Sequence, residues 1–454
     1  MVWLILWVLG GCGDEPGPSS VQPAPLVEAS VAAPDIVLAL VSGVRSDGQA
    51  GQAFLDATDV KGLRFSTTYS QSPSTFASLG SILTGRYVAA IPMCGLLLEG
   101  DRSHRDDQQA WCAEIPAAQN TLAEVLGIYG YRTGFFTADL TGAARLSHGF
   151  QTQSHHSAWS DATEAASAWW KQSDTQPRLM VVVLSDGEGD VLQSDALPRF
   201  PERKYQWLEP LDPRIGKVSL SEEAVGTAYV QAARRAGTSL GGLLGGLGDV
   251  RPRWSVVGST NGMSLTERGG FFDAQVPLLQ NNILVDRSIR VPMMLSGPGL
   301  QAGQSDAIVQ WVDVFPTLAA VAGVVAPAGQ PGVDLRTTVG GPAYAEFGDM
   351  LSLRMDDDLL VFRCTQHNAT SIDPGLTRVL TDPQQASPGQ FYSLYNVRQD
   401  PMQNQNVQGS SATKFERLHN GMIQLRTGVA AVPSEAITPE RLWSLRMAPS
   451  DGYW

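Results

Sequence analysis

The sequence predicts an α/β protein in which a doubly wound, mostly parallel sheet is followed by a small antiparallel sheet. Two observations lead to this prediction. Short apolar runs alternate with helical segments over most of the chain, and this pattern gives way to short alternating runs after residue 335. Alternation of strands with helices is typical of parallel sheets with helices on both faces.

Four apolar runs have the length and composition of strands that are buried on both faces of a sheet. They cover residues 35–41, 178–184, 254–258 and 291–296, and a shorter strand begins at 135–136. Helices are predicted over 121–133, where Gly130 closes the helix, and over 161–171 and 221–247. We therefore place an α/β domain at 35–335.

A second unit follows at 336–454. Its apolar runs are short and alternate with polar residues (AYAEF, LLVFR, TRVL and FYSLYNV), and a helix is predicted near 411–427. Alternation with period two is typical of antiparallel strands that have one solvated face. This unit is expected to be a small antiparallel sheet subdomain.

The N-terminal segment has the pattern of a lipoprotein leader. An apolar run too short to span a bilayer ends at Leu9-Gly10-Gly11-Cys12, which is similar to a bacterial lipobox in which the Cys is acylated. Residues 13–34 are rich in Pro, Ser and Ala, which is the composition of a tether. We predict a signal peptide with a lipidated Cys12 at 1–12 and a linker at 13–34.

This leader predicts a bacterial cell-envelope protein that is anchored to the membrane through Cys12. Gly13 carries no inner-membrane retention signal, which favours the outer membrane, facing the periplasm or the cell surface. In an oxidising envelope Cys94 and Cys112 could form a disulfide, which would leave Cys364 over. No second long apolar run follows, so no other segment is expected to span the membrane.

Composition limits the classes of partner. Hydrophobic residues make up 43% of the chain and charged residues 17%, as in globular proteins. The formal net charge of −13 argues against nucleic acid, because phosphate binding needs clustered Lys and Arg.

The stretch 67–87, TTYSQSPSTFASLGSILTGRY, places a hydroxyl at the start of an apolar helix. A helix N-terminus offers unpaired N–H groups and a dipole that favour anions, so Thr75 could be a nucleophile at an anion site. The alternative is that Thr75 or Ser74 is simply the N-cap of the helix. The local sequence favours the N-cap.

Eight motifs along the chain resemble the sulfatases and their phosphatase and phosphotransferase relatives in the alkaline-phosphatase-like superfamily. In order they are DIVLALVSGVRSDG, STFASLGSILTGRY, NTLAEVLGIYGYRTGFF, HGFQTQ, STNGMSLTERGG, RSIRVPMMLSGPGLQAG, WVDVFPTLAAVAGV and SLYNVRQDPMQNQNV. The resemblance implies a sulfatase-like α/β core with a small C-terminal sheet. It also implies sulfate or phosphate ester chemistry at a divalent cation held by carboxylates.

Position by position, the resemblance places the charged site residues of the family on mostly uncharged residues of this chain. The acidic pair after the first strand falls on Ser42 and Gly43, and the nucleophile falls on Thr75. The family's Lys-Trp-His segment falls on 137–139. At the third strand, Thr260 replaces a metal carboxylate and Asn261 remains as a metal-ligand type.

Three further positions that carry His in the family fall on other residues. The resemblance places them at Glu188, Arg268 and Gln280. The chain therefore matches the family's motifs at positions that set backbone geometry, as at Thr84-Gly85. It differs from them at positions that carry charge or bind the metal. We expect a scaffold whose metal site has degenerated.

Three functions remain open. The first is an inactive or impaired sulfatase-like lipoprotein, without a cofactor, whose cleft binds an anionic or glycan ligand or an envelope protein. The second is an active ester hydrolase or transferase with Thr75 as nucleophile and one divalent cation (Ca, Mg, Mn or Zn). It would use an acidic neighbour among Asp47, Asp139, Asp186, Glu188 and Glu267. The third is an envelope scaffold whose cleft is filled by large side chains.

Two other clusters could suggest metal sites. His155-His156 follows the GFQTQ segment and is interpreted as a solvated loop. The acidic run 356–358 could attract Ca²⁺, but its place before LLVFR favours an exposed hairpin turn.

Overall fold

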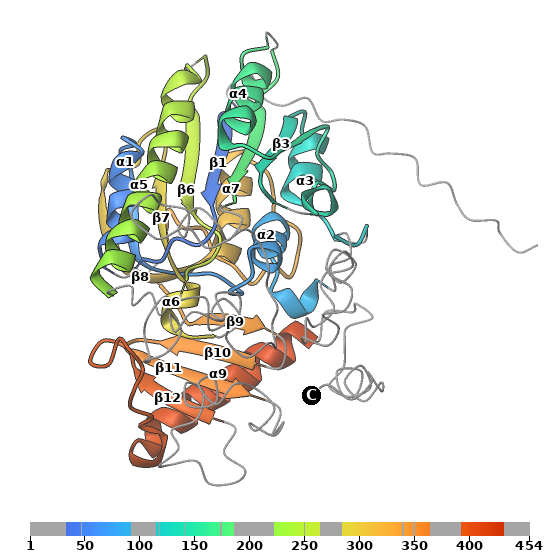
Figure 1. Ribbon diagram of the computed structural model, residues 1–454. Coiled ribbons are helices and arrows are strands. Elements are labelled where there is room, and N and C mark those ends of the chain that lie inside the picture. The colour runs from blue at the N-terminus through green and yellow to red at the C-terminus, as the bar shows by residue number, and fades with distance from the viewer. Residues whose placement is uncertain are drawn as a thin grey trace, which may run out of the picture.

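The computed structural model describes residues 33–46, 48–91, 115–117, 119–140, 142–172, 175–185, 222–248, 250–263, 284–337, 340–347, 350–363 and 392–430. Two sheets organise these residues, a large one with helices on both faces and a small one beneath it (Figure 1). The predicted fold class is confirmed.

The large sheet has eight strands in the order β4-β3-β5-β1-β6-β7-β2-β8. Its strands are β1 (Asp35–Val41), β2 (Leu63–Tyr69), β3 (Arg132–Ala138), β4 (Thr152–His156), β5 (Arg178–Leu184), β6 (Arg253–Ser259), β7 (Arg290–Ser296) and β8 (Gly303–Gln310). β7 runs antiparallel to both neighbours, and every other pair is parallel. The central strand β1 lies between β5 and β6, so both of its edges are hydrogen-bonded within the sheet.

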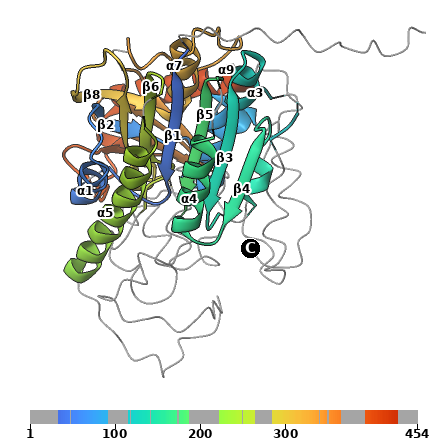
Figure 2. The same ribbon diagram turned by 90° about the horizontal axis from the view of Figure 1, so that it is seen from above.

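Helices cover both faces of this sheet, as Figure 2 shows from above. The helices of the large domain are α1 (Gln49–Ala57), α2 (Thr75–Thr84), α3 (Leu122–Ile128), α4 (Trp159–Trp170), α5 (Glu222–Gly246), α6 (Asp286–Ile289) and α7 (Val314–Val321). Short 3-10 turns are η1 (Val88–Ala90), η3 (Ala143–Leu146) and η5 (Trp311–Asp313). Alternate residues of β1 point to opposite faces, so Ile36 and Leu38 join one core while Val37 and Ala39 join the other.

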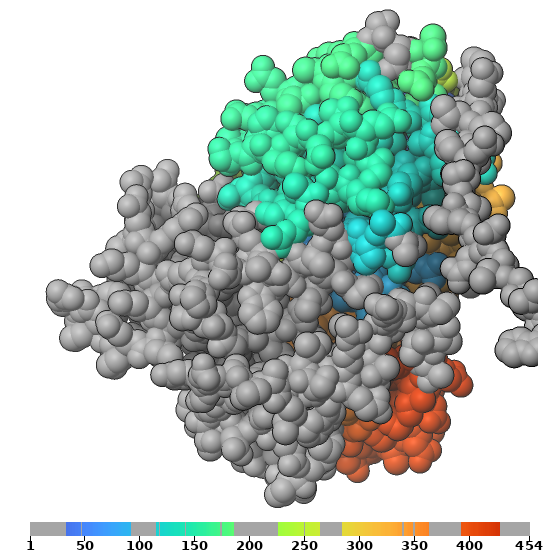
Figure 3. Space-filling model, turned by 90° about the vertical axis from the view of Figure 1, so that its right-hand side faces the viewer, coloured from blue at the N-terminus to red at the C-terminus, as the bar shows by residue number. Residues whose placement is uncertain are grey.

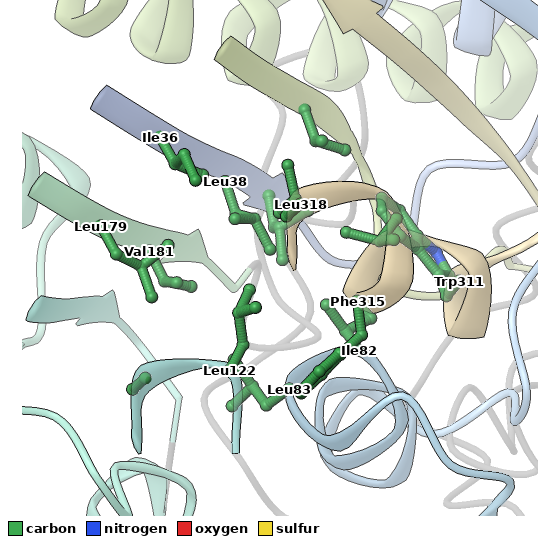
Figure 4. Close-up of a cluster of buried hydrophobic side chains, with 14 of the residues drawn as sticks. Ile36, Leu38, Ile82, Leu83, Leu122, Leu179, Val181, Trp311, Phe315 and Leu318 are labelled. Atoms are coloured by element: carbon green, nitrogen blue, oxygen red, sulfur yellow. The ribbon is translucent and has the colours of Figure 1, made fainter. Parts of the chain in front are cut away.

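The core on the α2 side is the one that positions α2. Ile82 and Leu83 of α2 are fully buried beside Leu318 and Phe315 of α7 and Leu122 of α3 (Figure 4). Each buried side chain of this size contributes about 1.5–3 kcal/mol through removal of apolar surface from water. The apolar run after Thr75 therefore fixes the helix against the sheet.

The small sheet is antiparallel throughout, in the order β12-β11-β10-β9. Its strands are β9 (Ala343–Phe347), β10 (Met350–Met355), β11 (Asp358–Arg363) and β12 (Tyr392–Asn396), and they are followed by η6 (Gln408–Ser410) and α9 (Ala412–Ala430). Helix α9 packs on this sheet, with Leu418 and Met422 in its core. On the face shown in Figure 3, the C-terminal helix segment (orange-red) lies below the teal and green part of the large domain.

Within the acidic run at 356–358, Asp356 and Asp357 form the predicted turn between β10 and β11, whereas Asp358 is the first residue of β11 and is buried. The carboxylates of this run are paired with cations, since Asp356 lies 2.8 Å from Arg417 and Asp358 lies 2.9 Å from Lys414. These internal cations supply the positive charge that Ca²⁺ would otherwise bring.

The sequence located the four apolar strands and the long helix α5 correctly, but three details were wrong. The helix predicted over 121–133 ends at Ile128, because Gly130 turns the chain with φ +82° and Arg132 and Thr133 belong to β3. The His155-His156 pair lies in strand β4 and not in a loop. Strands β2, β4, β8 and β10 were not predicted.

Several predictions fall on residues outside the described ranges. These are the leader with Cys12, the linker, the TRVL run, the cysteines Cys94, Cys112 and Cys364, and the site positions Glu188, Arg268 and Gln280. Within the ranges that the structure describes, no helix is long and apolar enough to cross a membrane.

Candidate functional site

The candidate site lies where three parallel strands end side by side. β1 ends before Ser42, β5 before Ser185, and β6 before Thr260 and Asn261. Because the carboxyl ends of parallel strands meet at one edge of a sheet, these side chains gather there. We call this group, together with Thr75 at the start of α2, the carboxyl-edge site.

Thr75 is brought to this edge by the packing of α2. It is the first helical residue, and Ser74 occupies the N-cap position without a side-chain capping bond. The Thr75 hydroxyl instead donates to Asn261 Oδ1 at 2.8 Å. The side-chain capping that the local sequence favoured is therefore not formed, and the hydroxyl points toward β6.

Asn261 is held in a fixed orientation by its neighbours. Its Oδ1 accepts a second hydrogen bond, from Thr260 Oγ1 at 2.8 Å, and its Nδ2 donates to the Gly262 carbonyl at 3.1 Å. Asn261 is 2% exposed and Thr260 is fully buried. Since an amide oxygen has two lone pairs, both acceptor sites of Oδ1 are in use.

Ser42 and Ser185 form a second pair of hydroxyls. Their Oγ atoms lie 3.2 Å apart, and both residues are buried. Ser259 links the neighbouring backbones, since its Oγ accepts from the Val44 N–H at 3.0 Å and lies 2.8 Å from the Asn261 carbonyl. The carboxyl edge of β1 and β6 is thus joined by neutral hydrogen bonds.

Gly43 adopts a backbone conformation that disfavours a ligand side chain at this position. Its φ of +78° favours glycine, and its carbonyl accepts from the Tyr229 hydroxyl at 2.6 Å. A Cβ at this position would lie 3.4 Å from Met263 Cε. That distance is an ordinary van der Waals contact, so the positive φ is the main obstacle to a side chain here.

These residues do not fit the divalent cation that the resemblance implies. A hard cation needs several oxygen ligands, including charged carboxylates that offset its dehydration. Here Ser42 and Thr260 offer neutral hydroxyls, Gly43 offers no side chain, and Asn261 Oδ1 already accepts two hydrogen bonds. Among the described residues, no group of three His, Cys, Asp or Glu side chains could hold a metal ion.

Of the acidic residues considered as neighbours of Thr75, only Asp139 lies within the described ranges. Asp139 directly follows β3 at φ +50°, and its N–H donates to the His156 carbonyl at 2.9 Å. Asp47, Asp186, Glu188 and Glu267 lie outside the described residues.

The two histidines of β4 do not form a metal pair. Consecutive strand residues point to opposite faces, and each imidazole has a hydroxyl partner of its own. His155 Nδ1 lies 2.8 Å from Thr137 Oγ1, and His156 Nε2 lies 2.6 Å from Ser154 Oγ. Burial and the neighbouring His156 lower the pKa of His155, so its neutral form is favoured.

The structure adds residues to the site that the sequence did not single out. Ser185 was visible as the turn after a predicted strand, but its partnership with Ser42 depends on the strand order. No sequence pattern pointed to Met263 or Tyr229 as site residues. Met263 lies in a loop, and Tyr229 lies in a long helix rich in Ala and Gly.

The fold agrees with a comparison to protein families. The model of the family described as Sulfatase matches residues 42–324, which is more than half of the chain. The chain belongs to the sulfatase family. The match begins at Ser42 and includes Thr75, Thr260 and Asn261, so the carboxyl-edge site lies within the family region.

Solved structures show the same fold for this sulfatase-family chain. One is a protein in complex with its substrate D-glucosamine-2-N,6-O-disulfate (15% identity, TM-score 0.62, 88% of this chain and 99% of that one). Another is a 2-O GAG sulfatase (13%, 0.64, 88% and 93%), and a third is the phosphonate monoester hydrolase of Agrobacterium radiobacter (15%, 0.60, 87% and 96%). A search of curated proteins found no match.

Proposed function

We propose that this sulfatase-family protein binds an anionic ligand, foremost a sulfated sugar, at the carboxyl-edge site without hydrolysing it. We further propose that it is anchored to the bacterial envelope through Cys12. The first proposal rests on the hydrogen bonds of the Asn261 side chain. Its oxygen, the atom with which an Asn would ligate a cation, is saturated by the hydroxyls of Thr75 and Thr260.

The same contact leaves Thr75 without an activating partner among the described residues. A Thr hydroxyl becomes a useful nucleophile when a metal lowers its pKa or an adjacent base removes its proton. Thr75 donates its hydrogen to an amide oxygen, which accepts a hydrogen bond but is a very weak base in water. The hydroxyl therefore stays protonated.

The proposed ligand class follows from the relatives and from the local geometry. One relative is in complex with a disulfated glucosamine and another is a 2-O GAG sulfatase. In this chain Thr75 still begins a ten-residue helix, whose first N–H groups favour an anion. Loss of the cation thus removes the means of cleavage while the helix N-terminus is retained.

The test separates binding from turnover. Full chain carrying Cys12→Ser for solubility is assayed with Ca²⁺, Mg²⁺, Mn²⁺ or Zn²⁺ against aryl sulfate, phosphomonoester and phosphodiester substrates. Calorimetry measures binding of sulfated and unsulfated glucosamine. We expect binding that requires the sulfate groups and no turnover above the rate of heat-denatured protein.

Robust turnover that is abolished by Thr75→Ala would establish the alternative function, an ester hydrolase or transferase with a rebuilt metal site. Absence of both binding and turnover would favour the third possibility, an envelope scaffold. For the anchor, incorporation of radiolabelled palmitate that is lost in Cys12→Ser is expected. Unlabelled wild-type protein would contradict it.

A further inference from the structure

Both ends of helix α2 are attached to the same strand of the small sheet. The loop at 70–74, which delivers Thr75, is hydrogen-bonded to β9. The segment at 87–90, which follows α2, is hydrogen-bonded to β9 as well. A single element of the C-terminal unit therefore touches the entry and the exit of the helix that carries Thr75.

The entry contact centres on Gln71, which is fully buried. Its carbonyl accepts from the Glu346 N–H at 2.9 Å, and its Nε2 donates to the Tyr344 carbonyl at 3.4 Å. Gln310 completes the contact, since its Oε1 accepts from Gln71 Nε2 at 3.2 Å and from the Tyr344 N–H at 2.8 Å. The loop before Thr75 is thus held along β9 by backbone and side-chain bonds.

The exit contact centres on the carboxylate of Glu346. Its Oε1 accepts from the Ala89 N–H at 2.7 Å, one residue into η1. The ring of Tyr87 packs edge-on against Tyr344 at 5.1 Å between centroids, and Gln310 Nε2 donates to the Tyr87 hydroxyl at 3.3 Å. The chain that leaves α2 is therefore held by the same strand residues.

Arg426 of α9 neutralises this carboxylate. Its Nη1 lies 2.7 Å from Glu346 Oε2, and the Glu346 side chain is only 7% exposed. Burial raises the pKa of Glu346, while the charge of Arg426 opposes that rise. A buried carboxylate that loses its cation must either take up a proton or move toward water, and both responses disturb its bond to Ala89.

We propose that the Glu346–Arg426 pair is a positioning device that couples the docking of helix α9 to the placement of Thr75. Release of α9 frees Glu346, and the freed strand loosens α2 at both ends while the central sheet stays intact. This coupling goes beyond the proposed ligand binding and does not depend on it. It makes the C-terminal unit a control element for the carboxyl-edge site.

Hydrogen exchange of the full chain, read by mass spectrometry, tests the coupling without any ligand. The variants are Arg426→Gln, Glu346→Gln and Arg426→Lys. The control is Arg417→Gln, which removes the ion pair of the same helix with the exposed Asp356 at 2.8 Å and a longer one with Asp358 at 3.7 Å. We expect the amides of 78–84 to exchange at least about tenfold faster in Arg426→Gln and Glu346→Gln, because local opening governs their protection.

Arg426→Lys keeps the charge and is expected to restore part of the protection of α2, whereas Arg417→Gln leaves it unchanged. The amides of β1 and β5 are expected to keep their wild-type rates in every variant that folds. If Arg426→Gln fails to fold, Arg426→Lys carries the test through a smaller acceleration confined to α2. Loosened α9 with unchanged α2 would overturn the proposal, and so would equal acceleration of β1 and α2.

Discussion

The two ends of strand β1 differ in how they handle charge. At its start, Asp35 is buried and accepts from the Arg178 backbone N–H at 2.9 Å and from Arg178 Nε at 3.2 Å. The Arg178 guanidinium also lies 4.2 Å from the ring of Trp170. At its other end, Ser42 and Gly43 carry no charge, and hydroxyls replace the expected carboxylates.

This difference separates a buried charge that has a partner within the chain from positions that carry no charged side chain. The carboxylate of Asp35 is paired with a cation from the same chain, so its burial is compensated without any external partner. Carboxylates at Ser42 and Gly43 would have needed a bound divalent cation. The start of β1 therefore holds a compensated internal charge pair, while its carboxyl end is held by neutral hydrogen bonds.

The largest effect is expected at the charged end. Asp35→Ala leaves Arg178 buried without its carboxylate, and we expect a loss of about 3–5 kcal/mol of unfolding free energy in urea titrations. Asp56→Asn is the matched control, because its pair with Arg64 is exposed and such pairs contribute about 0–1 kcal/mol. Equal losses in the two variants would contradict the distinction.

A smaller loss is expected at the neutral end. Asn261→Ala removes the acceptor of both Thr75 and Thr260 and should cost about 1–3 kcal/mol, since the buried hydroxyl of Thr260 and the half-buried hydroxyl of Thr75 lose their partner. Asn404→Ala removes an exposed Asn and serves as the control. A gain of stability in Asn261→Ala would indicate a strained catalytic residue, and it would count against the structural role given to Asn261 here.

Asp313 sharpens the comparison, because it is a buried carboxyl just beyond β8 whose hydrogen-bond donors are backbone N–H groups. It accepts from the Gln310 N–H at 2.7 Å and the Val333 N–H at 2.9 Å, and burial raises its pKa to about 6. A raised carboxyl pKa means that the folded state binds more protons between the unfolded and folded pKa values. Its contribution to stability therefore grows as pH falls from 7 toward 4.

Between pH 7 and pH 5 this growth should amount to about 1 kcal/mol. It is measured as the difference in unfolding free energy between wild type and Asp313→Asn at each pH. A constant difference across this range would refute the assignment of the titration to Asp313.

The sequence predicted the large sheet well because its central strands are continuous apolar runs, as in 35–41 and 178–184. It missed β2 and β8 because these strands are only partly buried and carry polar residues, so no apolar run marks them. The helix that carries Thr75 was also visible, since its apolar run and the Gly85 stop are local features.

The site itself was predictable only in part. Sequence alone indicated that Ser42, Gly43, Thr75, Thr260 and Asn261 share one place. It did not indicate that Asn261 Oδ1 receives two hydroxyls or that Met263 lies beside Gly43, because both contacts depend on the path of loops after the strands. The attachment of α2 to β9 was equally hidden, since Gln71 and Glu346 are far apart in the chain.

The central claim is that the carboxyl-edge site has exchanged its cation for internal hydrogen bonds. Elemental analysis tests it most directly, on full chain equilibrated with Ca²⁺, Mg²⁺, Mn²⁺ or Zn²⁺ and then freed of unbound ions, beside Asn261→Ala. The account predicts metal contents far below stoichiometric in both proteins. One equivalent of metal in the wild type that is lost in Asn261→Ala would contradict it.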